Sequence, residues 1–69
     1  MLSDAYCIIS ETTEDRFDET DSLEEAIRIA RCLARDGQAG ESISIEHRGK
    51  VIRQWVRKPD GKVEEATLV

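Results

Sequence analysis

Few residues of this 69-residue chain have the types and spacing that enzymatic chemistry requires. His47 is the only histidine, and no nucleophile is spaced to act with it. The acidic pairs Glu14-Asp15, Asp18-Glu19 and Glu24-Glu25 could act as general acids or cation ligands, but they lack EF-hand spacing, and no glycine-rich phosphate loop accompanies them. We interpret them as a solvated acidic segment. The sequence therefore predicts a protein that is not an enzyme and binds no metal or cofactor.

The two cysteines, Cys7 and Cys32, lie far apart on different predicted elements, unlike the closely spaced ligands of a metal site. The first residues lack the basic region of a signal peptide, and no apolar run is long enough to cross a membrane. We therefore expect a cytoplasmic protein with no membrane partner, whose thiols are reduced and buried or half-buried. A regulated or intermolecular disulfide at Cys32 is the alternative.

The strongest candidate for a contact surface is a tryptophan between two arginines. Trp55, the only tryptophan, alternates with Arg53 and Arg57 along a predicted strand, so the three side chains are expected on one face of the sheet. We expect this face to be uncovered, with Val51 and Leu68 beside it, and a tryptophan of this kind is a typical protein-binding anchor. A purely structural role is the alternative, because arginine stems can pack over the indole and a nearby glutamate can pair with them.

A second candidate surface is the solvent side of a predicted helix, which carries Arg28, Arg31 and Arg35. The net charge is −5, but its sign changes along the chain. Residues 1–27 hold nine acidic residues against one arginine, whereas residues 28–58 hold eight basic residues against three acidic ones. The arginines could bind nucleic acid or another polyanion. Pairing within the chain and a solvated helix face are the simpler interpretations.

One amphipathic helix, over about residues 22–36, is the element around which the rest of the chain is arranged. Its apolar residues recur at steps of three and four, which places them on one side of a helix. They are Leu23, Ala26, Ile27, Ala30, Leu33 and Ala34. Ser22 is positioned to cap the helix start with Glu25, and Gly37 to end the helix in a left-handed conformation.

Strands are predicted on both sides of this helix. Residues 5–10 are rich in β-branched and aromatic side chains and predict a central strand. Residues 16–20 predict a short edge strand whose Phe17 packs near the helix start. The expected fold is α+β, a two-layer sandwich in the order β(β)αβββ, with the helix covering one face of a mostly antiparallel sheet.

Two turns set the pairing of the last three strands. Arg48-Gly49 predicts a two-residue turn between strands over residues 42–46 and 51–57, and Lys58–Gly61 predicts a turn into a last strand over residues 62–68. The residues expected on the inner face, against the helix, are Ile43, Ile45, Ile52 and Val56. The expected pairs are Ile45 with Ile52, Ile43 with Gln54, Val56 with Val63, Trp55 with Glu64, Arg53 with Ala66 and Val51 with Leu68.

The chain is expected to form a single domain over residues 1–69, in a size range where stability is marginal and association with a partner would help. A short strand, the capped helix opened by Phe17–Ala26 and an isoleucine-rich hairpin follow one another over residues 16–57. This order resembles small bacterial domains of unknown function, which implies a compact, non-enzymatic bacterial module and carries over no site residue. From the residues themselves we expect a binding or self-associating module whose partner is a second copy or another protein, with nucleic acid as the alternative.

Overall fold

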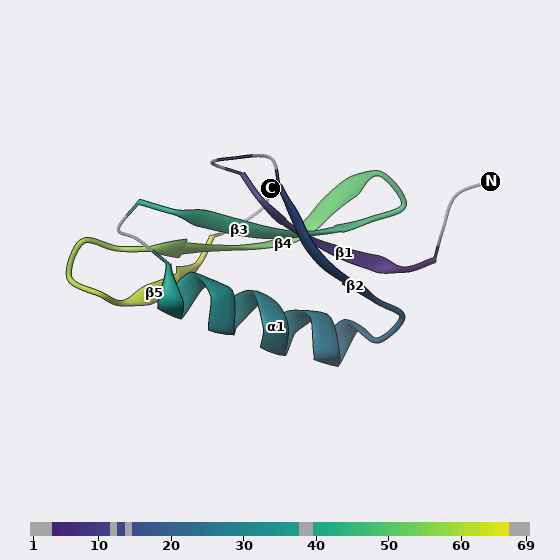
Figure 1. The fold of residues 1–69 in the computed structure, drawn as a ribbon, viewed down its shortest axis with the longest axis horizontal. Coiled ribbons are helices and arrows are strands. Elements are labelled where there is room, and N and C mark those ends of the chain that lie inside the picture. Colours follow the sequence, from purple (N-terminus) through teal and green to yellow (C-terminus); the bar gives the residue numbers. More distant parts are fainter. Residues whose placement is uncertain (1–3, 12, 14, 38–39, 67–69) are drawn as a thin grey trace.

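In the computed structural model, which describes residues 4–11, 13, 15–37 and 40–66, one helix packs against one face of a five-stranded antiparallel sheet (Figure 1). The elements are β1 (Tyr6–Ser10), β2 (Arg16–Thr20), α1 (Leu23–Asp36), β3 (Ser42–His47), β4 (Lys50–Arg57) and β5 (Val63–Glu65). The order across the sheet is β2-β1-β3-β4-β5. The predicted α+β class, the element order and the interior position of the first strand are confirmed.

Helix α1 begins and packs as its sequence pattern predicts. The Ser22 hydroxyl accepts a hydrogen bond from the backbone N–H of Glu25, at 3.3 Å, and so satisfies one of the free amides of the first turn. Every fourth residue on the sheet side is a completely buried alanine: Ala26, Ala30 and Ala34. Because alanine has a short side chain, the helix can lie close to the sheet.

The two ends of α1 differ from the prediction in detail. Gly37 is extended, with φ −80° and ψ −175°, and does not adopt the left-handed conformation. The carbonyl oxygen of Arg35 instead accepts a hydrogen bond from the guanidinium of Arg57 on β4, which ties the helix end to the sheet. At the helix start, the N–H of Ser22 donates to the hydroxyl of Thr20 at 3.3 Å and the Glu25 carboxylate forms an ion pair with Arg28, in place of the expected reciprocal cap.

The hydrophobic core lies between α1 and the central strands. Ile8 on β1 and Ile43 and Ile45 on β3 are completely buried, as predicted for the two residues of β3. Trp55 on β4 completes this core and is only 3% exposed. Half-buried hydrophobic residues packed around the core include Ile27, Ile29 and Leu33 of the helix.

The pairing of β3 with β4 is shifted by one residue from the predicted register. The expected two-residue turn is present, and both of its residues have positive φ. A bulge then follows between Ile45 and Glu46, where β4 contributes one additional residue. The observed pairs, Ile45 with Arg53 and Ile43 with Trp55, replace the predicted pairs with Ile52 and Gln54. Because successive side chains point to opposite faces, this shift exchanges the two faces of β4.

The pairing of β4 with β5 is also shifted by one residue. The predicted turn is present, because the N–H of Gly61 donates to the carbonyl of Lys58 at 2.9 Å. The observed pairs are Trp55 with Glu65, Val56 with Glu64 and Arg57 with Val63, in place of Val56 with Val63 and Trp55 with Glu64. The N–H of Ala66 donates to Gln54 and not to the predicted Arg53. Leu68, the predicted partner of Val51, lies outside the described residues.

Phe17, predicted to pack near the helix start, is not a buried anchor. It lies on the edge strand β2, where the pairing with β1 shifts between Ile8 and Ile9, and it is 45% exposed. Val51, at the start of β4, is 38% exposed. These two are the large hydrophobic side chains that the described part of the chain leaves exposed.

Candidate functional site

The tryptophan and the two arginines of β4 share one face of the sheet, as predicted, but this face is the one that α1 covers. The prediction that Trp55 lies on the uncovered face was wrong, because the bulge in the hairpin turns β4 over. The indole is part of the core, and the Arg53 guanidinium lies over its ring at 5.5 Å from the ring centroid. Arg57 contacts the end of α1. Trp55 is therefore a buried core residue and not an exposed binding anchor.

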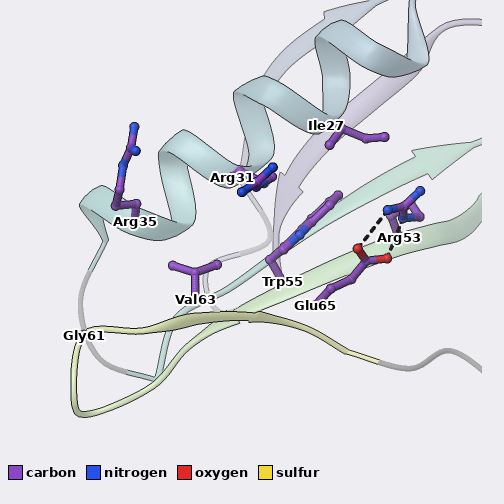
Figure 2. A pocket seen from close by; sticks show the side chains of 8 residues that line it. All are labelled: Ile27, Arg31, Arg35, Arg53, Trp55, Gly61, Val63 and Glu65. Atoms are coloured by element: carbon purple, nitrogen blue, oxygen red, sulfur yellow. Dashed lines mark hydrogen bonds and ion pairs between the residues drawn. The ribbon is translucent and has the colours of Figure 1, made fainter.

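Beside this core, α1, β4 and β5 enclose an open groove of about 420 Å³, shown in Figure 2. We call it the arginine groove. It is lined by Ile27, Arg31, Arg35, Arg53, Trp55, Gly61, Val63 and Glu65. The helix supplies one wall with two arginines, the strands supply the other wall, and the indole projects from β4 toward the helix between them (Figure 2). Its volume falls within the range of about 300–1,000 Å³ that is typical of ligand pockets.

An ion pair on the strand side occupies one of the three groove arginines. The Nε and Nη2 atoms of Arg53 donate to the two carboxylate oxygens of Glu65, at 2.6 and 2.8 Å, in a two-pronged contact. This hydrogen bond raises the pKa of Arg53 and holds the pKa of Glu65 below its usual range. Glu65 and Arg53 lie on neighbouring strands because β5 pairs with β4 through Trp55 and Glu65.

The two arginines of the helix wall have no such partner. Arg31 and Arg35 are four residues apart, so they lie on the same side of α1, and both are exposed. Within the described ranges, no carboxylate forms an ion pair with either of them. The positive charge of Arg31 contributes to the lowered pKa of Glu65 across the groove, and Arg35 makes a 3.5 Å contact with the sulfur of Cys32.

Arg28 belongs to a different environment from the other two helix arginines. Its guanidinium pairs with Glu25 one turn before it, and this pairing raises its pKa. A second hollow of about 340 Å³ runs along the outer side of α1 and shares Ile27, Arg31 and Arg35 with the arginine groove. This hollow also contains the carboxylate of Glu24, which opposes the binding of a further anion.

The groove has the composition of an anion-binding surface with an apolar floor. Three arginines and one glutamate line it, and arginine forks match the geometry of carboxylate and phosphate groups. The half-buried side chains of Ile27 and Val63 pack against the core beside Trp55. Such a surface can hold a negatively charged group and an adjacent apolar one at the same time.

The other residues considered for chemistry lie away from the groove or are used structurally. His47 is half-buried, and its ring stacks on Tyr6 with 4.2 Å between the ring centroids. Both cysteines are free and half-buried, as predicted, and burial raises the pKa of the Cys7 thiol. Among the residues that the structure describes, no group of three or more His, Cys, Asp and Glu is arranged to hold a metal ion. Likewise, none of the described helices is long and apolar enough to span a membrane.

The structure thus joins parts of the two predicted surfaces into one site. Arg31 and Arg35, predicted as a polyanion surface, line the same groove as Arg53 and Trp55, predicted as a protein contact. Arg28, Arg57 and Val51 do not line this groove, and Leu68 lies outside the described residues.

The sequence interpretation missed Glu65 and the apolar floor residues Ile27 and Val63 as parts of a site. The sequence does contain one signal for these residues: the single tryptophan, which a small core is expected to bury, with apolar neighbours around it. In a chain with so few aromatic residues, the core needs its largest side chain.

The ion pair of the groove predicts a pH-dependent contribution to stability. The pKa of Glu65 is lower in the folded chain than its ordinary value of 4.5, so the contribution is complete above that value and is lost as the pH falls through the lowered pKa. Since the Glu65 side chain is 41% exposed, we expect the ion pair to contribute less than about 1 kcal/mol to the free energy of unfolding. Urea unfolding of the wild type and Glu65→Gln should show a difference at neutral pH that disappears in strong acid. A difference that stays constant would contradict this origin.

Comparisons with protein-family models, with curated proteins and with solved structures gave no match to this chain. The resemblance to small bacterial domains therefore stays a prediction, and the argument for function depends on the groove.

Proposed function

We propose that this chain is a small, non-enzymatic binding module that holds an acidic segment of a protein partner in the arginine groove. One observation carries the proposal: Arg31 and Arg35 are exposed, line the groove together with its apolar residues, and have no carboxylate partner among the described residues. A carboxylate of the partner would accept their N–H groups, as Glu65 already does for Arg53. An apolar side chain next to that carboxylate would contact Ile27 and Val63.

One feature of the groove favours a protein segment over nucleic acid. The indole of Trp55 is 3% exposed, so its face is not available for the stacking that single-stranded nucleic acids use. A polyanion that binds along Arg28, Arg31 and Arg35 is the alternative, and it is favoured only by the hollow along the outer side of α1.

The buried tryptophan gives a direct test, because Trp55 is the only tryptophan and lines the groove. Its fluorescence would be followed during titration with synthetic heptapeptides that carry a central phenylalanine between aspartates and glutamates. We expect a saturable change with these peptides and none with peptides in which lysines replace the acidic residues. In Arg31→Glu/Arg35→Glu, affinity should fall at least about a hundredfold, because two charge-assisted hydrogen bonds of about 1.5–3 kcal/mol each are lost.

A matched control separates the groove from the overall charge. Arg48→Glu/Lys50→Glu makes the same change in net charge at the other end of β4, and it should bind the peptides almost as the wild type does. Equal weakening in both double variants would contradict a specific groove. A single-stranded oligonucleotide serves as the second probe: tighter binding than the acidic peptide, with a steep loss in salt, would favour the polyanion alternative.

A further inference from the structure

We infer that the segment held in the arginine groove is β2 of a second copy of this chain, with Phe17 contacting the apolar floor and its acidic neighbours pairing with Arg31 and Arg35. This inference rests on the proposed function and names the partner of the same groove. It depends on three observations: the exposure of Phe17, the charge of its segment, and the separation of β2 from the groove within one molecule.

Phe17 is the most exposed large hydrophobic side chain that the structure describes, at 45%. Its position at a register shift on an edge strand keeps it out of the core of its own molecule. Aromatic side chains that stay exposed on a folded surface carry much of the binding energy once a partner covers them. Phe17 is therefore an anchor without a pocket in its own molecule.

The segment around Phe17 has the charge that the groove lacks. Residues 15–21 contain four acidic residues against one arginine. Arg16 and Glu19 form a loose ion pair at 3.5 Å between exposed side chains, whereas Asp15, Asp18 and Asp21 form no ion pair within the described residues. The arginine groove carries three guanidinium groups against one carboxylate. The two surfaces are complementary both in charge and in having one apolar element next to the charges.

The fold separates β2 from the strand wall of the groove within one molecule. β2 and β5 are the two opposite edges of the sheet, with three strands between them. At about 4.8 Å between neighbouring strands, the two edges lie roughly 19 Å apart. Figure 1 shows β2 beside the start of α1 and β5 beside its end. An acidic edge and a basic groove that lie apart within one molecule can meet between two.

The proposed contact joins two different surfaces, so variants that each lack one of these surfaces should complement one another. Each molecule has one β2 segment and one groove, so a molecule that lacks one of them still offers the other. Sedimentation equilibrium would compare the wild type with Phe17→Ser and with Arg31→Glu/Arg35→Glu. The wild type should associate as its concentration rises, and each variant alone should associate at least about thirtyfold more weakly, because an anchor of this type contributes that factor or more.

The decisive measurement is a mixture of the two variants. An equimolar mixture should form a 1:1 complex at concentrations where neither variant associates alone, because the intact groove of Phe17→Ser receives the intact β2 of the other variant. All substituted residues are exposed, and far-ultraviolet circular dichroism should show that both variants are folded. Arg48→Glu/Lys50→Glu should associate as the wild type does.

A wild type that stays monomeric at millimolar concentration would overturn the inference, and so would a variant mixture that does not associate. Association of Phe17→Ser that equals the wild type would also overturn it. The peptide titration separates these failures from failure of the proposed function. A monomeric protein that still binds the acidic heptapeptide keeps the groove as a binding site for a foreign acidic segment, whereas a protein that binds neither loses both proposals.

Discussion

Trp55→Ala is expected to unfold a large fraction of the molecules at room temperature. The indole is 3% exposed and belongs to the core cluster that contains the buried alanines of α1 and the isoleucines of β1 and β3. Truncation of a buried aromatic side chain to alanine costs about 3–5 kcal/mol. A chain of 69 residues has roughly 3–10 kcal/mol of unfolding free energy in total. Urea unfolding followed by far-ultraviolet circular dichroism measures the loss, since the fluorescent residue is absent from the variant.

Trp55→Phe is the control for this prediction. It keeps an aromatic ring beside Ile43 and should remain folded, with a smaller loss of unfolding free energy than the alanine variant. If the free energy of unfolding of Trp55→Ala lies within about 1 kcal/mol of the wild-type value, the indole does not fill the core as described. Because Trp55→Ala is expected to unfold, a loss of binding in this variant could not be assigned to a lost contact. The exposed arginines are therefore the residues to vary in binding experiments.

The sequence predicted the helix well because several local signals agree there. The spacing of the buried alanines, the capping Ser22 and the acidic first turn all act within a few residues of one another, and the structure contains each of them. The two hairpin turns are predicted equally well, because positive φ at Gly49 and Gly61 is a local requirement that glycine meets. Elements that local energetics determine can be predicted from one sequence.

The register of β4 could not be predicted in the same way. Alternation of side chains has a period of two, so it gives no indication of a bulge that adds one residue to one strand. The adjacent apolar residues Val51 and Ile52 break the alternation at the position of the bulge, but they fit a simple strand equally well. Tertiary packing decides between the two registers, because the shifted register places Trp55 in the core. The register had to be observed.

The candidate site was predicted in pieces and not as a whole. Charge and residue type identified the arginines of α1 and of β4 separately. Their meeting in one groove depends on which face of β4 the helix covers, and this was the feature that the unpredicted bulge reversed. Glu65 enters the site through the second register shift, because the observed pairing of β4 with β5 places it beside Arg53.

Ile45→Ala should destabilise the fold by about 2–5 kcal/mol, the range for truncation of a fully buried isoleucine. Ile45 is completely buried on the central strand β3, where it pairs with Ile8 on one side and Arg53 on the other. Its removal leaves a cavity under α1 that the neighbouring strands cannot fill without moving. Chemical unfolding of the variant, followed by Trp55 fluorescence, measures the change.

Two further variants make this prediction specific to the observed register. Ile45→Val removes one methyl group and should cost about 0.5–1.5 kcal/mol, so the losses should follow the volume removed. Val56, which the simple alternation placed against the helix with Ile45, is only half-buried and lies outside the core cluster. Val56→Ala should therefore cost much less than Ile45→Ala. Equal losses at Val56 and Ile45 would instead support the register without a bulge, in which Val56 faces α1 and the arginine groove loses its floor.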